Sequence, residues 1–240
     1  LNHSFDLVLP EELVRDGTDE NPQLRSVRGE VLNGKFDLVD KFTERTGTVA
    51  TLFVRKGDDF LRVTTSLKKE SGERAVGTNL AREHAAYAAL SAGKPYVGRA
   101  VLFGKAYYTS YSPIKNAAGT VIGASFIGLD ISRELETLKK QIKERKVGSS
   151  GYYFVLDANP GKDFGTLLVH PAKEGSNILA AKDAGGREFI REMLEQGKGE
   201  IIYPWMNAEL GETSAREKIA VFETLPDAKW LVAEGTYLDE

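Results

Sequence analysis

Apolar runs of strand length recur along the chain in the same order twice. From residue 47 to 131, and again from 148 to 240, two apolar runs flank a polar turn, and a helical segment and three further runs follow. Gly, Pro, Asn and Asp occupy the turns, where they tolerate or preset the backbone angles that a turn requires. The repetition predicts two modules built on one plan.

Five strands are predicted in each module. The ten ranges are 48–54, 60–67, 96–103, 106–114 and 121–129, then 152–156, 166–170, 200–205, 218–222 and 230–237. Helices are expected at 81–92 and 186–196, each followed by a glycine of the kind that ends helices. Short connections favour antiparallel hairpins over a parallel sheet, which needs crossover helices. We therefore expect an α+β fold of two tandem PAS-like modules, each an antiparallel sheet flanked by helices.

A helical stripe joins the two modules. Ile131, Leu135, Leu138 and Ile142 recur at helical spacing, and charged residues occupy the other faces. We expect this helix to pack on the second sheet, as amphipathic helices usually do. A helix shared with a partner subunit is the alternative.

These elements predict a division of the chain into three parts. They are a first module with an N-terminal extension (1–131), a connecting helix (132–147) and a second module (148–240). Within the extension we expect a helix at 36–45, and we expect the segment 7–39 to pack on the first module.

Composition and charge narrow the class of protein. Of the 240 residues 41% are hydrophobic and 28% are charged, which is enough for a hydrophobic core that needs no disulfides or metals to hold it together. The net charge is −3, with acids and bases interspersed, so neither a nucleic-acid partner nor membrane-surface binding is predicted. No run of about 18 apolar residues and no signal peptide occur. The chain begins without methionine and ends directly after a strand pattern, so we expect it to continue at both ends.

Motifs of catalysis are missing from the sequence. The absence of cysteine excludes disulfides, a cysteine nucleophile and thiolate metal sites. There is no HExxH, GxSxG, P-loop or paired metal-ligand spacing, so no enzyme, metal or cofactor is predicted. Of the three histidines, His84 is interpreted as a surface or helix-capping residue. His170 lies at a strand end, where a pocket could open, and is equally compatible with a structural role.

In the first module, polar side chains alternate with apolar ones along two strands. Arg62, Thr64 and Ser66 are expected on one face, where an arginine beside hydroxyls suits a carboxylate. On the strand 106–111 one face carries Tyr107, Thr109 and Tyr111, and the other carries Tyr108 and Ser110. Tyrosines supply apolar walls with a polar tip. The alternative is a solvated strand face with a surface salt bridge.

The second module combines aromatic residues with two basic ones. Tyr152, Tyr153, Tyr203 and Trp205 occur with His170 and Lys218, a set that could form a cage for a small anion. Core packing also explains Trp205 and one tyrosine, but explains less well a lysine at the start of a strand near them.

These residues together resemble double Cache sensor regions, the fused Cache-type periplasmic domains of methyl-accepting chemotaxis proteins and related receptors. The resemblance covers nearly the whole chain from about residue 31. The segments that carry it are 47–53, 62–67, 77–78, 100–104 and 108–113, then 151–155, 170–171, 174–175, 203–205, 217–219 and 230–240.

The resemblance implies an extracytoplasmic location, flanking transmembrane helices, a cytoplasmic signalling domain and a homodimeric receptor. It also implies a small-molecule ligand, commonly a short carboxylate or an amino acid, bound between the sheet and the loops on its helix-facing side. The binding residues would be Arg62, Thr64, Tyr96, Tyr107, Tyr108 and Thr109 in the first module, and Tyr153, His170, Tyr203, Trp205 and Lys218 in the second. The family's amino-acid signature is not clearly present, which favours a simple carboxylate.

We therefore expect a sensor that binds a small organic anion and passes a small displacement toward its C-terminus. The first rival is a module that recognises a periplasmic binding protein, and the second is a dimerisation scaffold with a vestigial second pocket. The third is a hydrolytic enzyme, which the missing motifs disfavour.

Overall fold

The structure is a computed structural model that describes residues 13–206, 208 and 211–240. The chain divides into two compact units, Leu1–Leu135 and Glu136–Glu240. The expected packing of residues 7–12 lies outside the described residues. The finer division, with 132–147 as a connector, stays a prediction.

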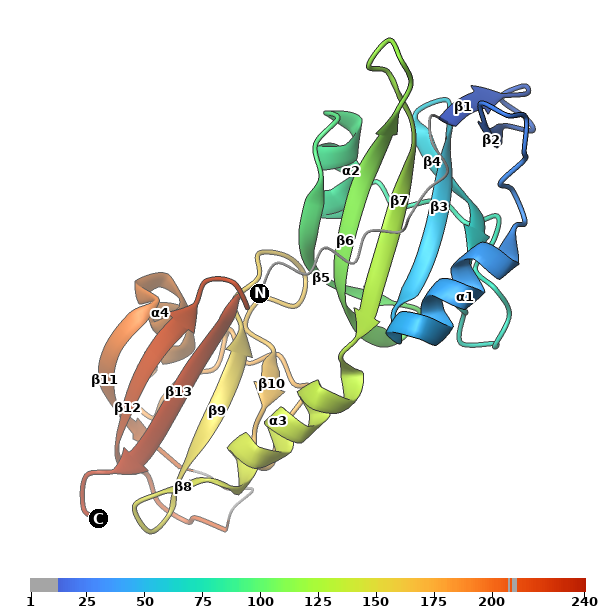
Figure 1. Ribbon diagram of the computed structural model, residues 1–240. Coiled ribbons are helices and arrows are strands. Elements are labelled where there is room, and N and C mark those ends of the chain that lie inside the picture. Colours follow the sequence, from blue (N-terminus) through green and yellow to red (C-terminus); the bar gives the residue numbers. More distant parts are fainter. Residues whose placement is uncertain (1–12, 207, 209–210) are drawn as a thin grey trace. The chain divides into compact units, whose positions relative to one another are not determined.

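The first unit is built on a five-stranded antiparallel sheet. Its strands are β3 (Val49–Lys56), β4 (Asp59–Thr65), β5 (Tyr96–Leu102), β6 (Lys105–Lys115) and β7 (Val121–Asp130). Their order across the sheet is β4-β3-β7-β6-β5 (Figure 1). The last strand of the module, β7, is therefore central, and the first strand, β3, lies beside it.

Opposite faces of this sheet hold two separate apolar cores. On one face, here the α1 face, α1 (Phe36–Thr46) packs with residues from the hairpin of β1 (Leu13–Asp16) and β2 (Gln23–Ser26). On the other, the α2 face, α2 (Ala85–Ser91) covers a more aromatic core. The α1-face core includes Leu24, Leu32, Val39, Leu52 and Val54, and the α2-face core includes Phe53, Phe60, Leu90, Tyr111 and Phe126. The expected packing of the extension on the first module is confirmed for its described part.

The second unit repeats this sheet. Its strands are β9 (Gly151–Asp157), β10 (Leu167–Val169), β11 (Lys198–Trp205), β12 (Arg216–Leu225) and β13 (Trp230–Tyr237). They follow the order β10-β9-β13-β12-β11, which is that of the first sheet, and every pair of neighbours is antiparallel.

Helices and a short edge pairing complete the second unit. The two-residue strand β8 (Lys146–Val147) also pairs with β9. One face of the sheet, the α4 face, is covered by α4 (Phe189–Gln196), whose apolar side packs into the core. The predicted α+β class with antiparallel sheets is therefore confirmed. Both capping glycines end their helices with positive φ, and both helices begin later than predicted, at Ala85 and Phe189.

The joining helix α3 (Ser132–Glu144) departs from its prediction. None of its residues is buried, and Leu138 in the apolar stripe is 45% exposed. The expectation that the stripe packs into the second sheet is therefore wrong. None of the described helices is long and apolar enough to cross a bilayer.

Candidate ligand-binding sites

A buried arginine lies on the α2 face of the first unit. Arg62 on β4 is 4% exposed, and its guanidinium carbon lies 4.8 Å from the ring centroid of Phe53 and 5.8 Å from that of Phe103. Its Nη1 donates to the Thr78 hydroxyl, which itself donates to the carbonyl of Ala75 at 2.7 Å. Within the described part of the chain no carboxylate pairs with Arg62. The positive charge is therefore positioned by neutral groups only.

Two buried polar atoms, one on this arginine and one on a neighbouring tyrosine, have no hydrogen-bond partner among the described residues. Among the described residues, Nε of Arg62 and the hydroxyl of Tyr111 have no hydrogen-bond partner. Such a buried group costs about 1–3 kcal/mol, and more when it is charged. Burial lowers the pKa of Arg62 to about 10, which leaves it charged at neutral pH, and burial raises the pKa of Tyr111, which keeps the phenol protonated. Both groups are therefore donors that lack an acceptor.

Two further rings adjoin Tyr111. The ring of His84 lies 5.4 Å from that of Tyr111 and 5.7 Å from that of Tyr96, and the two tyrosines are 6.2 Å apart. Nδ1 of His84 accepts from the backbone N–H of Ala86 at 3.1 Å, so the neutral ring carries its proton on Nε2. Burial lowers the pKa of His84, which favours that neutral form. The Arg62 cluster thus comprises Arg62, Thr78, His84, Tyr96 and Tyr111.

Thr64 does not belong to this cluster, which corrects its prediction. In the β3–β4 pairing Phe53 lies opposite Arg62, but the adjacent Leu52 lies opposite Thr64, because Val63 forms a bulge between them. Arg62 and Thr64 therefore point to opposite faces. Thr64 faces the α1 face, where its hydroxyl donates to the Leu32 carbonyl at 2.5 Å and accepts from the N–H of Gly34.

The three predicted residues of β6 differ in exposure and in hydrogen bonding. Tyr108 is 52% exposed on the outer face, so it lies outside the Arg62 cluster. Thr109 lies on the buried face, but its hydroxyl donates to the Gly98 carbonyl at 2.8 Å. Tyr107 is buried on the same face as Tyr111, against Gly128.

A second buried cation lies on the α4 face of the second unit. Lys218 on β12 is 1% exposed, and its Nζ lies 3.9 Å from the ring centroid of Tyr152 and 5.4 Å from that of Tyr237. No oxygen of a described residue accepts a hydrogen bond from this ammonium group. Burial lowers the pKa of Lys218 to about 8, and the acidic groups of Glu212 and Glu240 oppose this only in part.

Aromatic rings extend from this lysine along β11. Tyr203 lies directly opposite Lys218 in the β11–β12 pairing and stacks on Phe189 at 4.2 Å. Trp205 packs against Phe189 with centroids 5.1 Å apart. Burial raises the pKa of Tyr203 well above its ordinary value, and its hydroxyl donates to no described residue. The structure therefore places Tyr203 beside both Lys218 and Trp205 on the α4 face.

His170 and Tyr153 differ in how they relate to Lys218. Nδ1 of His170 accepts from the N–H groups of Ala172 and Lys173 at 3.0 and 2.9 Å, and its ring meets that of Tyr152 edge-on at 5.1 Å. Tyr153 is on the opposite face of β9, where it hydrogen-bonds Glu234. Tyr153 therefore lies outside the Lys218 cluster, since strand alternation directs Tyr152 to Lys218.

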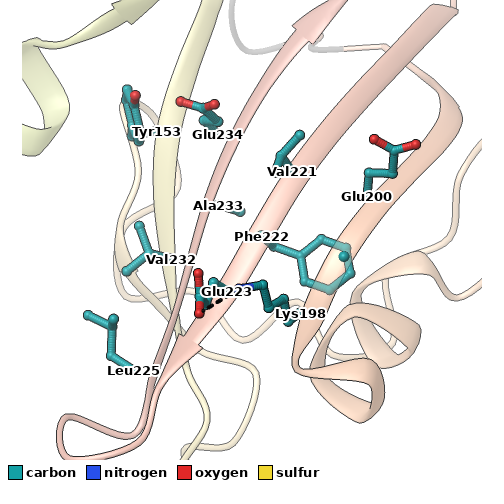
Figure 2. Close-up of a pocket in the computed structure, with 11 residues that line it drawn as sticks. Tyr153, Lys198, Glu200, Val221, Phe222, Glu223, Leu225, Val232, Ala233 and Glu234 are labelled. Carbon is teal, nitrogen blue, oxygen red and sulfur yellow. Dashed lines mark hydrogen bonds and ion pairs between the residues drawn. The ribbon is translucent and has the colours of Figure 1, made fainter.

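The opposite face of the second sheet carries an open groove, which Figure 2 shows. Its volume is about 590 Å³, and its lining includes Tyr153, Glu200, Val221, Leu225, Val232 and Glu234. Lys198 lines it as well, but is paired with Glu223 at 3.1 Å. The surplus of carboxylates makes this groove unsuited to an anion.

Several residues of the two clusters were not among those predicted to bind. Tyr111 was placed on the correct face by alternation, and the same alternation separates it from Tyr108. His84 caps α2 as interpreted, but its ring contacts depend on how α2 packs on the sheet. Thr78 and Tyr237 reach their clusters through contacts that no local pattern encodes.

Solved structures share this fold at low sequence identity. The ligand-binding domain of Mlp24 with asparagine is 13% identical, with a TM-score of 0.52 over 85% of this chain and 74% of that one. The sensor domain of the Vibrio cholerae histidine kinase DctB is 16% identical, with a TM-score of 0.51 over 85% and 78%. A shorter match, 23% identical over 43% of this chain and 71% of that one with a TM-score of 0.37, is a Cache chemosensory domain described for carboxylic acid recognition.

No curated protein sequence matches the chain. The model of the Cache 3/Cache 2 fusion domain, however, matches residues 18–240, almost the whole length. Cache domains are extracytoplasmic sensor domains of membrane receptors, among them chemotaxis receptors and histidine kinases. The resemblance noted from the sequence is thereby confirmed, and the chain belongs to the Cache 3/Cache 2 fusion domain family.

Proposed function

We propose that this chain is the extracytoplasmic ligand-binding region of a transmembrane chemotaxis or signal-transduction receptor, and that its first unit binds a short carboxylate at Arg62. One observation carries the proposal. Arg62, which is only 4% exposed, has no carboxylate partner in the described chain, and its Nε and the neighbouring Tyr111 hydroxyl lack acceptors. An anion with two acceptor oxygens supplies what both groups lack.

Each residue of the Arg62 cluster has its own role in binding the carboxylate. The guanidinium provides the charge and a planar edge, and Thr78 fixes its orientation through Nη1. The Tyr111 hydroxyl is a second donor, and Nε2–H of His84 adds a third beside the same ring. Charge-assisted hydrogen bonds of this kind are about twice as strong as neutral ones.

The ligand class follows from the groups in the cluster. It contains donors and no carboxylate, so it has nothing to neutralise the ammonium group of an amino acid. This favours a simple carboxylate, although Mlp24, which has the same fold, was solved with the amino acid asparagine. The ligand is bound and not transformed. Signalling then follows from a shift toward the conformation that fits the ligand better.

Calorimetric titration with short mono- and dicarboxylates tests this function. Arg62→Met keeps the volume of the side chain but removes the charge, and we expect about 100-fold weaker binding, since hydrogen bonds to a buried charge are worth about 1.5–3 kcal/mol. Arg82→Met is the matched control, because Arg82 is an exposed arginine of the same unit that pairs with Asp59 at 2.8 Å.

Two outcomes would refute the carboxylate sensor. One is unchanged affinity in Arg62→Met, and the other is the absence of heat from every carboxylate tested. The second result would favour recognition of a periplasmic binding protein or a dimerisation scaffold. Consumption of a bound carboxylate would instead identify an enzyme.

A further inference from the structure

We infer that the carboxylate of Glu240 is a latch that fastens the end of β13 to the turn after α3, so that a movement of α3 is passed directly to residues 237–240. The turn consists of residues 148–150, between β8 and β9. The inference concerns how a signal is transmitted, and not which ligand binds or where. It rests on the proposed function in one respect, because the proposed receptor has to pass a displacement toward residue 240.

Both carboxylate oxygens of Glu240 accept hydrogen bonds from this turn. Oε2 accepts from the backbone N–H of Ser150 at 2.9 Å, and Oε1 accepts from the Ser150 hydroxyl. Thr236, on β13 itself, donates its hydroxyl to Oε2 at 3.1 Å. The hydrogen bonds from Ser150 lower the pKa of Glu240 to about 2, so the carboxylate is ionised at neutral pH. One ionised side chain therefore holds the turn and the strand end together.

Arg216 on β12 holds the latch from the other side. Its Nη2 lies 3.3 Å from Oε1 of Glu240, and its Nε donates to Oδ2 of Asp239 at 3.0 Å. Its guanidinium carbon lies 4.0 Å from the ring centroid of Tyr237. A network of this kind keeps its geometry better than a single exposed ion pair. Arg216 therefore makes residues 237–240 one cluster with β12.

The backbone beside the latch leaves no room for a side chain. A Cβ at Gly151 would lie 2.3 Å from the carbonyl oxygen of Val147 and 2.6 Å from that of Gly235. The pairing of β13 with β9 ends at Gly235, and beyond it Thr236 and Tyr237 pair only with β12 among the described strands. The contacts of Glu240 therefore continue the connection between β13 and the segment before β9 past the end of the ladder.

The turn is joined to α3 by a short connection. α3 ends at Glu144 and β8 begins at Lys146. Lys143, in the last turn of the helix, pairs with Glu174 at 2.7 Å, in the loop after β10. None of the residues of α3 is buried, so a shift of the helix disrupts no apolar core. A displacement of α3 therefore reaches the turn, and the latch carries it to residues 237–240.

The absence of cysteine allows the latch to be tested with two introduced spin labels. Lys140→Cys on α3 and Leu238→Cys after β13 replace exposed residues. Double electron–electron resonance on the ligand-free full chain should give one narrow distance distribution, and Glu240→Ala should make it about twice as wide. Glu223→Ala is the matched control, because Glu223 is also an exposed glutamate, paired with Lys198 at 3.1 Å on the same sheet.

Amide hydrogen exchange on the unlabelled chain tests the coupling itself. The Ser150 N–H should exchange about tenfold faster in Glu240→Ala, since it loses its acceptor. Lys143→Ala frees the end of α3, and we expect it to speed exchange at Leu238 about threefold in the latched protein and not further in Glu240→Ala.

The inference is overturned if Glu240→Ala leaves both the distance distribution and the exchange at Ser150 unchanged, or if Glu223→Ala changes them equally. It is also overturned if the effects of Lys143→Ala and Glu240→Ala on Leu238 simply add, because independent effects mean that the latch does not connect the two segments. All of these measurements are made without ligand. Failure of the latch is therefore distinguishable from failure of the carboxylate sensor, which the titrations of Arg62→Met decide.

Discussion

Among the described residues, each unit buries one cation without a salt-bridge partner, and the two units hold it in different ways. Arg62 is oriented by a hydrogen bond to Thr78 and lies over two phenylalanine rings, with its pKa lowered to about 10. Lys218 has no such hydrogen bond, faces two tyrosine rings, and has a pKa near 8. Arg62 therefore stays charged throughout the neutral pH range, whereas Lys218 loses its proton at mildly alkaline pH.

The two cations also differ in geometry. A guanidinium group is a planar fork that prefers two parallel hydrogen bonds, whereas an ammonium group is a point charge that accepts many ligand angles. The first site should therefore discriminate between carboxylates by shape, and the second mainly by size and charge. Four experiments test this contrast.

The largest expected effect is on stability. At pH 7 the buried ammonium of Lys218 is charged at a cost, so Lys218→Met should raise the free energy of unfolding of the ligand-free protein by up to about 3 kcal/mol. The folded pKa of about 8 is below the ordinary value of 10.5. Between these pH values the folded state holds fewer protons, so wild-type stability rises with pH and the advantage of the variant fades. Urea denaturation at pH 7 and pH 10 measures both, and a destabilised variant at pH 7 would argue against a strained charge.

The next effect is on the pH dependence of binding. Deprotonation of Lys218 removes the charge, so a carboxylate that binds Arg62→Met at the predicted residue Lys218 should lose about tenfold in affinity per pH unit above 8, or about 30-fold at pH 9.5. The titratable groups around the lysine among the described residues are the phenols of Tyr152, Tyr203 and Tyr237, the imidazole of His170 and the carboxylates of Glu212 and Glu240. Binding to Lys218→Met, which reports on Arg62, should stay constant over the same range. If calorimetry shows the same pH dependence of affinity in both variants, the proposed difference between Arg62 and Lys218 is wrong.

Tyr111→Phe is expected to act on the first unit in two opposite directions. Removal of a buried hydroxyl without a partner should stabilise the ligand-free protein by about 1 kcal/mol, while loss of a donor should weaken carboxylate binding about tenfold. Thermal melts with and without ligand separate the two effects. A variant that loses stability without ligand would mean that the hydroxyl already has a partner.

The smallest effect is expected from Gly98→Ala. A Cβ at this position would lie 2.4 Å from the Tyr96 hydroxyl oxygen and 2.8 Å from Cζ, so the ring must move away from His84 and Tyr111. We expect a loss of affinity of about two- to fivefold at the Arg62 site and none at Lys218. Val97→Ala, on the exposed face of the same strand, is the control. Equal losses in both variants would indicate a general effect on β5.

Much of the fold could be predicted because the apolar runs are bounded by clear turn residues. The strands and glycine caps follow from local patterns, and alternation alone assigns Tyr107, Thr109 and Tyr111 to the buried face. The same rule applied to β9 and β6 would have selected Tyr152 over Tyr153 and Tyr111 over Tyr108. The differences between the predicted residues and the two clusters therefore came from the choice among residues, and not from the pattern.

Other features depend on tertiary contacts and could not be predicted from the sequence. The lack of buried residues on α3 depends on what packs against the helix, which periodicity does not predict. The ring contacts of His84 and the hydrogen bond of Thr78 arise from segments distant in sequence. The bulge at Val63 depends on the hydrogen bonds between β3 and β4, and the alternation of apolar and polar residues does not predict it.

That bulge has a consequence for comparing relatives of this chain. A relative that lacks one residue at position 63 could pair its strands regularly and still direct the arginine to the α2 face and the threonine to the α1 face. A relative of equal length without the bulge would place both on one face. An arginine aligned to Arg62 is therefore informative about the site only together with the strand pairing beside it. A gap in an alignment here can mark a conserved arrangement, and the lack of one can mark a changed arrangement.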